Sequence, residues 1–272
     1  MTGIMRRQLT LVKHVFLDMD GTIYHGSQLF PTTKPIPKFL SERQIGYTFL
    51  SNNSSYGYDD YIARLAKFDI STTRENFYIS TDYAIDYFKR NLPEIRKIFL
   101  LGMPAMTEMF LEAGFISEET APQAVIVGFD RKLTYERLCK AAYFLQRGVP
   151  GYATHPDVYC PTDEPTWLVD CGAITACLEK ATNTSLKVLG KPDPGMLIEA
   201  SARKQLSVNQ VLMAGDRLST DVALGVNAGA VSCHIVTPGA DLVPPKGIIP
   251  DYAVKNLGEL QAIWENEEKN CR

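Results

Sequence analysis

One repeated pattern limits most strongly how this chain can fold. A short hydrophobic run ends on a polar or acidic residue, and a segment of helical periodicity follows it. Residues 11–17 (LVKHVFL) lead into Asp18, and residues 45–50 (IGYTFL) lead into Ser51. Buried runs of this length and composition predict strands, and the apolar spacing after them predicts helices. Strands that alternate with helices favour a parallel sheet covered by helices. The chain is therefore expected to be an α/β protein.

The same alternation returns later in the chain and again in its middle. A strand is predicted at residues 211–214, with Gly215 and Asp216 at its end, followed by a helix that stops at Gly229. The further predictions are strands at 98–101, 124–129, 152–153, 186–189 and 231–236, and helices at 33–44, 59–68, from 104, at 134–146 and at 220–228. The middle is expected to form its own α/β module, residues 78–186, inserted between residues 1–77 and 187–272. The charged tail after Trp264 is expected to fray.

Composition excludes several classes of protein. The 272 residues include 28 Lys and Arg against 31 Asp and Glu, so the chain lacks the basic excess that is typical of proteins that bind nucleic acid polymers. The longest apolar run, residues 124–129, is far shorter than the ~20 residues that cross a bilayer, so no membrane span is expected. Six cysteines without C-x-x-C spacing, and no secretory signal peptide, favour free thiols in the cytoplasm. A metal site would then use oxygen ligands.

The segment Asp18-Met19-Asp20-Gly21-Thr22 directly follows the first predicted strand. Residues two apart in an extended backbone point the same way, so Asp18 and Asp20 can both face a ligand at the carboxyl edge of the sheet. Two close carboxylates repel each other, which favours a bound metal ion or an acid/base role. The alternative is that the two acids only end the strand and that Gly21 forms the turn.

A second acid pair, Asp216 and Asp221, follows the strand at 211–214. Together with Asp18, these carboxylates at strand ends suit Mg²⁺, which takes oxygen ligands and also binds phosphate oxygens. Asp221 has an alternative role at the start of a helix, where the helix dipole favours an acid.

Two further segments offer groups that bind phosphate. Ser51 and Asn52, at the end of the second strand, carry hydroxyl and amide donors beside the start of a helix. Lys191, in Gly190-Lys191-Pro192-Asp193-Pro194, is a cation in a loop stiffened by two prolines. Taken singly, the first segment can be an ordinary turn and the second a solvated lysine.

In this order, the motifs of Asp18 to Thr22, Ser51, Lys191 and Asp216 with Asp221 resemble those of the haloacid dehalogenase superfamily. Residues 48–55 (TFLSNNSS), 127–138 (VGFDRKLTYERL), 155–157 (HPD), 190–194 (GKPDP) and 215–221 (GDRLSTD) resemble its NagD-like, p-nitrophenylphosphatase-type branch of class IIA. The resemblance covers nearly the whole chain. It implies a Rossmann-like three-layer core with a parallel sheet and an inserted α/β cap of the C2 type.

The resemblance also implies a reaction and a set of roles. The chain would hydrolyse a small phosphate monoester, such as a sugar phosphate, with Mg²⁺ as cofactor. Asp18 would be the nucleophile that becomes an aspartyl-phosphate, and Asp20 the general acid/base. Mg²⁺ would be held by Asp18, the backbone carbonyl of Asp20 and Asp216, with Asp221 supporting that shell. Ser51, Asn52 and Lys191 would bind the phosphoryl group.

Substrate specificity is expected in the cap, where the resemblance implies that residues 155–172, which begin at His155, form the loop that reaches over the site. Asp170 is a candidate for hydrogen bonds to the hydroxyls of a polyol or sugar phosphate, and its alternative role is the N-cap of a helix at 172–180. The resemblance further implies a homodimer formed through the cap. Two other functions stay open at this point, a phosphotransferase or phosphomutase that uses the same aspartyl-phosphate and a noncatalytic module that binds a phosphate ligand.

Overall fold

The computed structural model describes residues 7–160, 166–237 and 243–271. These residues form two compact units. The first unit contains the described residues up to Leu50, Phe68–Tyr78 and those from Lys191 onward. The second contains Ser51–Lys67 and Ile79–Gly190.

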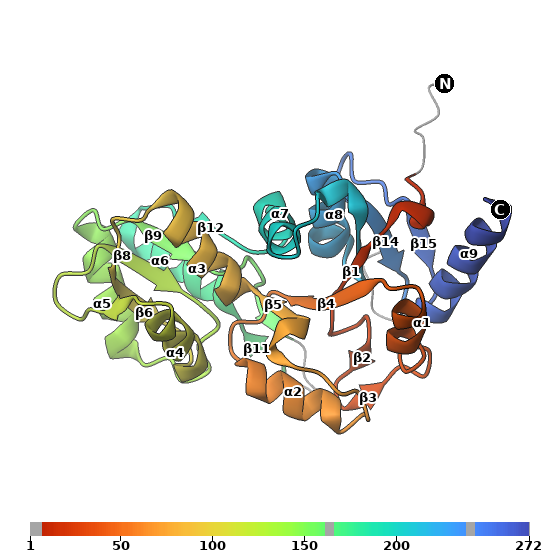
Figure 1. The fold of residues 1–272 in the computed structure, drawn as a ribbon. Helices are drawn as coiled ribbons and strands as arrows, with labels where there is room; N and C mark the ends of the chain where they lie inside the picture. The colour runs from red at the N-terminus through yellow and green to blue at the C-terminus, as the bar shows by residue number, and fades with distance from the viewer. Residues whose placement is uncertain (1–6, 161–165, 238–242, 272) are drawn as a thin grey trace. The chain divides into compact units, whose positions relative to one another are not determined.

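The first unit is built on a six-stranded sheet with the order β15-β14-β13-β1-β4-β5 (Figure 1). Its strands are β1 His14–Leu17, β4 Gly46–Ser51, β5 Phe77–Ile79, β13 Val211–Gly215, β14 Val231–Ile235 and β15 Tyr252–Val254. β1 is central and parallel to both neighbours, with Leu17 opposite Ala214 on one side and Phe49 on the other. The carboxyl ends of three strands therefore meet at one edge, next to Asp18.

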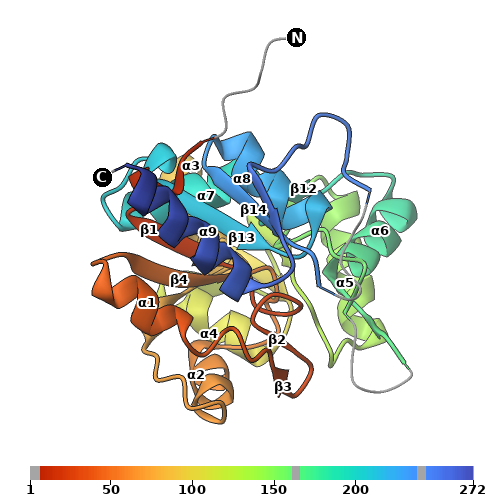
Figure 2. The same cartoon turned by 90° about the vertical axis from the view of Figure 1, so that its right-hand side faces the viewer.

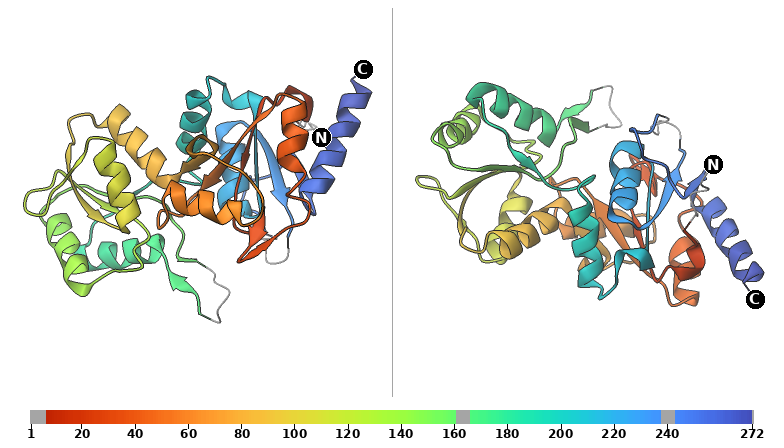
Figure 3. Two further views of the ribbon diagram at one scale, coloured as in Figure 1. Left: turned by 60° about the horizontal axis from the view of Figure 1, so that its bottom comes forward. Right: turned by 90° about the horizontal axis from the view of Figure 1, so that it is seen from above.

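Helices cover both faces of this sheet (Figure 3). α7 Pro194–Arg203 and α8 Ala223–Ala228 pack together on one face, and α1 Ile36–Glu42 and α9 Leu257–Asn270 pack together on the other. In Figure 2, α9 lies beside α1, and the Phe39 and Trp264 rings meet edge to face at 5.9 Å between centroids. The shorter elements are η1 Leu9–Leu11, β2 Tyr24–His25, β3 Gln28–Leu29, η2 Arg74–Asn76, η3 Val208–Gln210 and the π-helical turn η4 Leu218–Val222.

The second unit has its own five-stranded parallel sheet, with the order β12-β9-β8-β6-β7. Its strands are β6 Lys97–Leu101, β7 Ile116–Ser117, β8 Ala124–Val127, β9 Gly151–Ala153 and β12 Lys187–Val188. Its other elements are α2 Tyr58–Ala66, α3 Ser80–Asn91, α4 Pro104–Glu112, α5 Tyr135–Gln146, α6 Cys171–Thr182 and the hairpin β10 Tyr159–Cys160 with β11 Leu168–Val169. Buried residues of α5 and α6 pack on the strands in one apolar cluster.

The predicted parallel α/β core with an inserted α/β cap is confirmed, while the predicted cap limits, residues 78–186, stay a prediction. The expectation of a frayed tail after Trp264 is wrong, because α9 continues to Asn270. All six cysteines are free thiols. In the parts of the chain described above, no helix combines the length and the apolar character needed to cross a membrane.

Candidate active site

Asp18 stands directly after the four buried residues of β1. Its backbone N–H donates to the Ala214 carbonyl of β13 at 2.9 Å, so the sheet ladder holds its main chain in place. The Thr22 hydroxyl donates to Asp18 Oδ2 at 3.3 Å. The carboxylate is therefore fixed by residues of its own loop and by the neighbouring strand.

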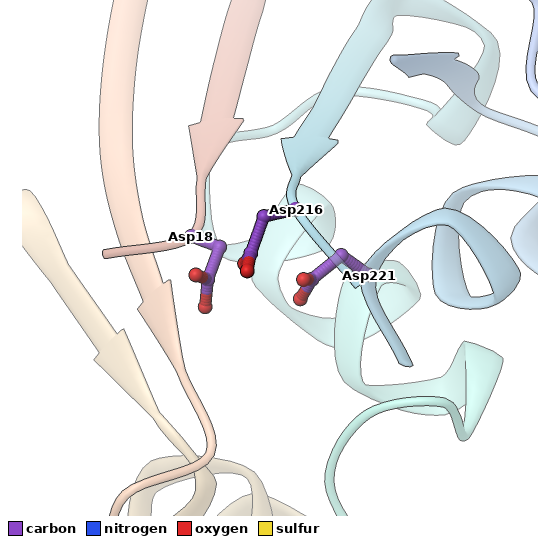
Figure 4. A group of neighbouring side chains, drawn as sticks. All are labelled: Asp18, Asp216 and Asp221. Carbon is purple, nitrogen blue, oxygen red and sulfur yellow. The ribbon is translucent and has the colours of Figure 1, made fainter. Parts of the chain in front are cut away.

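Asp216 and Asp221 complete a cluster of three buried carboxylates with Asp18 (Figure 4). Asp216 follows β13 directly, and Asp221 lies in η4. One carboxylate oxygen from each residue lies within 4.8 Å of the other two. The Arg217 backbone N–H donates to Asp221 Oδ2 at 3.0 Å, so the π-helical turn itself holds this side chain. The sequence prediction that these three acids lie together is consistent with this geometry.

Two glycines make room for the cluster. Gly21 has a φ of +86°, and a Cβ there would lie 2.3 Å from Asp216 Oδ2. At Gly215 a Cβ would lie 2.4 Å from the Cβ of Asp221. Both distances are well below van der Waals contact, so any side chain at either position would displace a carboxylate. The Thr237 hydroxyl donates to the Gly21 carbonyl at 2.8 Å and fixes the turn.

Lys191 is the cation of the cluster. It is 3% exposed, and its Nζ lies 2.5 Å from Asp18 Oδ1 and 2.6 Å from Asp221 Oδ1. Nζ also donates to the Leu50 carbonyl of β4 at 3.3 Å. The lysine therefore bridges two carboxylates and the backbone immediately before Ser51, and the alternative of a solvated surface lysine is excluded.

Burial and charge act together on the pKa values of these groups. Burial, and then the charge of Asp221, raise the pKa of Asp18 to about 7, although Lys191 opposes the rise. Burial, and then the charges of Asp18 and Asp221, raise the pKa of Asp216 to about 8. For Lys191, burial favours the neutral form, but the two carboxylates outweigh it and raise the pKa above its ordinary value. When all three carboxyls are ionised, the cluster carries an excess of negative charge that one ammonium does not neutralise.

The donor set fits a divalent cation. Asp216 Oδ1 is buried and has no hydrogen-bond partner, which is a costly state for a carboxylate oxygen unless a cation binds it. All three side chains offer oxygen, the ligand type that Mg²⁺ prefers. Asp18, Asp216 and Asp221 are therefore the residues that could hold a metal ion.

Asp20 lies outside this side-chain cluster. It is exposed, and its backbone forms an isolated bridge with Tyr24 at the start of the β2–β3 hairpin. The Gly21 N–H donates to the Tyr24 carbonyl at 2.8 Å, which stabilises the turn after Asp20. An exposed carboxyl beside buried Asp18 can exchange protons with solvent, and the acid/base role of Asp20 stays a prediction.

Ser51 and Asn52 are both buried. Ser51 is the last residue of β4, and its Oγ accepts a hydrogen bond from the Asn53 N–H at 3.2 Å. The Asn52 side chain donates to Asp157 Oδ2 at 3.2 Å. Their role as phosphate ligands stays a prediction.

The two candidate specificity residues, His155 and Asp170, are buried inside the second unit. His155 Nδ1 lies 3.5 Å from Asp157 Oδ2, and Nε2 lies 3.6 Å from Asp170 Oδ1. Asp170 is the N-cap of α6 and accepts a hydrogen bond from the Cys171 N–H at 2.5 Å. The capping alternative for Asp170 is thus observed, and a role of either residue in specificity stays a prediction.

Sequence reasoning assigned no role to several residues that shape the site. His234 Nε2 lies 3.0 Å from the Asp216 carbonyl oxygen, which can only accept, so Nε2 must donate. Thr22 and Asp157 lie within the motifs at residues 18–22 and 155–157, so membership of those motifs could have marked them as site residues. His234 lies in β14, the first strand after the motif at residues 215–221, and no pattern around it marks it as part of the site.

Comparison with known proteins adds independent findings. A family model described as haloacid dehalogenase-like hydrolase matches residues 15–116, and a HAD-hydrolase-like model matches residues 188–260. An acid sugar phosphatase of Staphylococcus aureus (strain MRSA252) is 29% identical over 256 residues, which are 93% of this chain and 98% of that protein.

Solved structures are similar over nearly the whole chain. A 4-nitrophenylphosphatase from Thermotoga maritima has a TM-score of 0.86 at 34% identity, and the match covers 93% of this chain and 98% of that one. NagD from E. coli K-12 has a TM-score of 0.83 at 25% identity, over 91% and 98% of the two chains.

Proposed function

Since the chain belongs to the haloacid dehalogenase-like hydrolases and is a NagD-like phosphatase, we propose that it hydrolyses small phosphate monoesters with Mg²⁺ through an aspartyl-phosphate. The observation that carries the proposal is the buried cluster of Asp18, Asp216 and Asp221 bridged by Lys191. Sugar phosphates are the proposed substrate class, because a relative that covers nearly the whole chain is named an acid sugar phosphatase.

In the first step, a carboxylate oxygen of Asp18 attacks the phosphorus atom as the bond to the leaving oxygen breaks. Asp20, in its protonated form, gives its proton to the leaving alkoxide, which departs as the alcohol. Asp18 must be ionised to attack, and the Lys191 ammonium opposes the rise of the Asp18 pKa that burial causes. The nucleophile and its cation are thus already paired before substrate binds.

In the second step, Asp20 is a carboxylate and takes a proton from water as the water oxygen attacks the phosphorus of the aspartyl-phosphate. The bond between phosphorus and the Asp18 oxygen breaks, inorganic phosphate leaves, and both aspartates return to their initial states. The exposure of Asp20 suits this role, since the group must meet both the leaving oxygen and water.

Asp18, Asp216 and the Asp20 carbonyl would hold Mg²⁺, with Asp221 supporting that shell, and the bound ion would neutralise the phosphoryl charge. Lys191 adds a second positive charge on the Asp18 side. Ser51 and Asn52, at the polar end of β4, would donate hydrogen bonds to phosphoryl oxygens. We further propose a cytoplasmic enzyme that acts on free metabolites and forms a homodimer.

The test is hydrolysis of p-nitrophenyl phosphate and of a panel of sugar phosphates, with Mg²⁺ or with a chelator. We expect activity only with the metal, and a loss in kcat of at least ~10³-fold in Asp18→Asn, since removal of a nucleophile abolishes the covalent route. Asp193→Asn is the matched control, because Asp193 caps α7 and asparagine caps equally well. An Asp18→Asn enzyme with full activity would contradict the proposed nucleophile.

A second variant separates the two steps. p-Nitrophenolate leaves readily without a proton, so Asp20→Asn should form the aspartyl-phosphate but hydrolyse it slowly. A burst of p-nitrophenol equal to the enzyme concentration, with the phosphoenzyme visible by intact mass spectrometry, is the expected result. Equal slowing of both phases would count against Asp20 as the base of the second step.

A further inference from the structure

Asn52 is held at both its backbone and its side chain. The Ser80 hydroxyl, at the start of α3, donates to the Asn52 carbonyl at 2.5 Å. The Asn52 Nδ2 donates to Asp157 Oδ2 at 3.2 Å. Asn52 and Ser80 are fully or almost fully buried, and all three residues belong to the second unit. The bond from Ser80 fixes the Asn52 backbone, and the bond to Asp157 limits rotation of its side chain.

Asp157 is itself anchored. The Gly172 N–H, in the first turn of α6, donates to the Asp157 carbonyl at 2.7 Å. A Cβ at position 172 would lie 2.1 Å from the Pro156 carbonyl oxygen, so only glycine allows this approach. The imidazole of His155 lies 3.5 Å from the same Oδ2 that accepts from Asn52. The backbone of Asp157 is therefore fixed by a helix start and its carboxylate by two side chains.

The chemistry of the pair determines which way the Asn52 amide faces. An ionised carboxylate only accepts hydrogen bonds, so Asp157 binds the nitrogen end of the amide and excludes the flipped orientation. Asn52 Oδ1 is then turned toward Gly190, where a Cβ would lie 2.9 Å from it. Without Asp157, the amide could turn and present its oxygen to an anion, which would repel it.

We propose that Asp157 is a positioning residue that orients the Asn52 amide so that its nitrogen end, and not its oxygen, is presented to the phosphoryl group. This inference rests on the proposed function, in which Asn52 is a phosphate ligand. In this proposal Asp157 acts on the phosphoryl group through Asn52.

The test is a double-mutant cycle with Asn52→Ala and Asp157→Ala, measured as kcat/KM for p-nitrophenyl phosphate and as the Kd of inorganic phosphate. In the wild-type background, Asp157→Ala should lower kcat/KM about tenfold, the typical effect of losing one hydrogen bond to a charged group. In the Asn52→Ala background it should change kcat/KM by less than about twofold, because the amide that Asp157 is proposed to orient is gone. Equal losses in both backgrounds would overturn the inference.

A conservative variant separates positioning from general damage. Asp157→Asn retains an amide oxygen that can accept from Asn52, so it should recover kcat/KM to within about threefold of wild type. Asp130→Asn is the matched control, since Asp130 is also a buried acid of the second unit but pairs with Arg137, at 2.9 Å. It should leave kcat/KM and the Kd of phosphate unchanged. An Asp157→Asn enzyme as weak as Asp157→Ala would show that charge, and not orientation, matters.

A spectroscopic measurement keeps this inference distinct from the proposed function. In ¹H–¹⁵N spectra of the full chain, the Asn52 side-chain NH₂ pair should shift and exchange faster with water in Asp157→Ala, whether or not the protein is active. An unchanged Asn52 signal would overturn the inference alone. Retained activity in Asp18→Asn would instead overturn the proposed mechanism. The spectra would still show whether Asp157 orients the Asn52 amide.

Discussion

Gly21 and Gly229 share a left-handed backbone but differ in their surroundings. Their φ values are +86° and +81°, yet a Cβ at Gly21 would meet the Asp216 carboxylate while one at Gly229 would meet no atom within 4 Å. Alanine at either position should therefore cost about 1 kcal/mol of stability from backbone strain. Only Gly21→Ala should also displace Asp216.

We accordingly expect Gly21→Ala to lower kcat about 100-fold or more and to weaken Mg²⁺ binding, since sub-ångström errors at a catalytic carboxylate are costly. Gly229→Ala should keep both properties. Steady-state kinetics and Mg²⁺ titration, together with urea unfolding of both variants, provide the comparison. Equal activities in the two variants would show that the cluster tolerates a shifted Asp216.

Asp216 should make the metal-free protein less stable as the pH rises. Burial, and then the charges of Asp18 and Asp221, raise its pKa from 3.8 to about 8, so the folded state binds a proton that the unfolded state has lost. The protonated Asp216 carboxyl contributes fully to the free energy of unfolding below pH 3.8. This contribution is lost as the pH rises toward 8, by up to ~1.4 kcal/mol per pH unit. Asp216→Asn should flatten this dependence and be more stable than wild type at pH 8 without metal.

Urea unfolding in a chelator between pH 6.5 and 8.5 measures this effect. Burial lowers the pKa of His14 from 6.5 to about 4, with a smaller contribution from Lys204, so His14 titrates below that range. Asp193→Asn, the cap of α7, should keep the wild-type slope. A steeper slope in Asp216→Asn than in wild type would contradict the proposed cause.

The acids of the cluster could be predicted from the sequence, but their fit to one another could not. Asp18 and Asp216 stand directly after strand ends, a position that hydrophobic patterning locates well, and Asp221 follows in the turn η4. The requirement for glycine at 21 depends on the Asp216 carboxylate, which another segment brings within 3 Å. Such contacts arise from tertiary packing and leave no local pattern.

Strands that form an uninterrupted buried run were easier to predict than the short edge strand β15. β13 and β8 agree with their predicted ranges to within two residues at each end, because each is an uninterrupted buried run. β15, with only three residues and an exposed middle one, has no such run, and it was not predicted. The predicted helix at 220–228 begins earlier, at Leu218, because the π-helical turn η4 precedes α8.

α9 shows why the charged tail is ordered. Trp264 is buried against Phe39, Glu267 accepts hydrogen bonds from the Leu9 N–H and the Tyr252 hydroxyl, and Glu268 pairs with Arg43 at 2.9 Å. These acids have specific partners on three elements of the same unit. A count of charged residues predicts solvation and cannot reveal such partners.

Truncation before Glu267 should therefore destabilise the protein. We expect the free energy of unfolding to fall by about 2 kcal/mol or more, because the partly buried hydrogen bonds of the Glu267 and Glu268 carboxylates are lost. Truncation after Asn270 removes no contact named above and should be neutral. Thermal unfolding of the two shortened chains distinguishes them, and equal melting temperatures would restore the expectation of a frayed tail.

The two units allow metal binding to be followed in one of them. The chain has two tryptophans, and Trp264 lies in the first unit while Trp167 lies in the second. In Trp167→Phe, Trp264 alone reports unfolding of the unit that holds the carboxylate cluster. Mg²⁺ at a hundredfold excess over its Kd should stabilise that unit by about 2.7 kcal/mol.

The expected measurement is a higher urea midpoint of the Trp264 fluorescence change when Mg²⁺ replaces the chelator. Adding Asp216→Asn to the same background should remove most of the increase, which identifies the site responsible. An equal increase in both proteins would place the bound metal elsewhere.

The central position of β1 has a consequence for how the enzyme is inactivated. Hydrogen bonds to β13 and β4 flank β1, so the detachment of an edge strand does not expose the backbone at Asp18. Amide hydrogens of β1 should exchange only through unfolding of the whole sheet, whereas those of edge strands exchange through local opening. Heat should thus abolish catalysis in the same step that unfolds the first unit, and a partly inactivated sample would be a mixture of fully active and fully unfolded molecules.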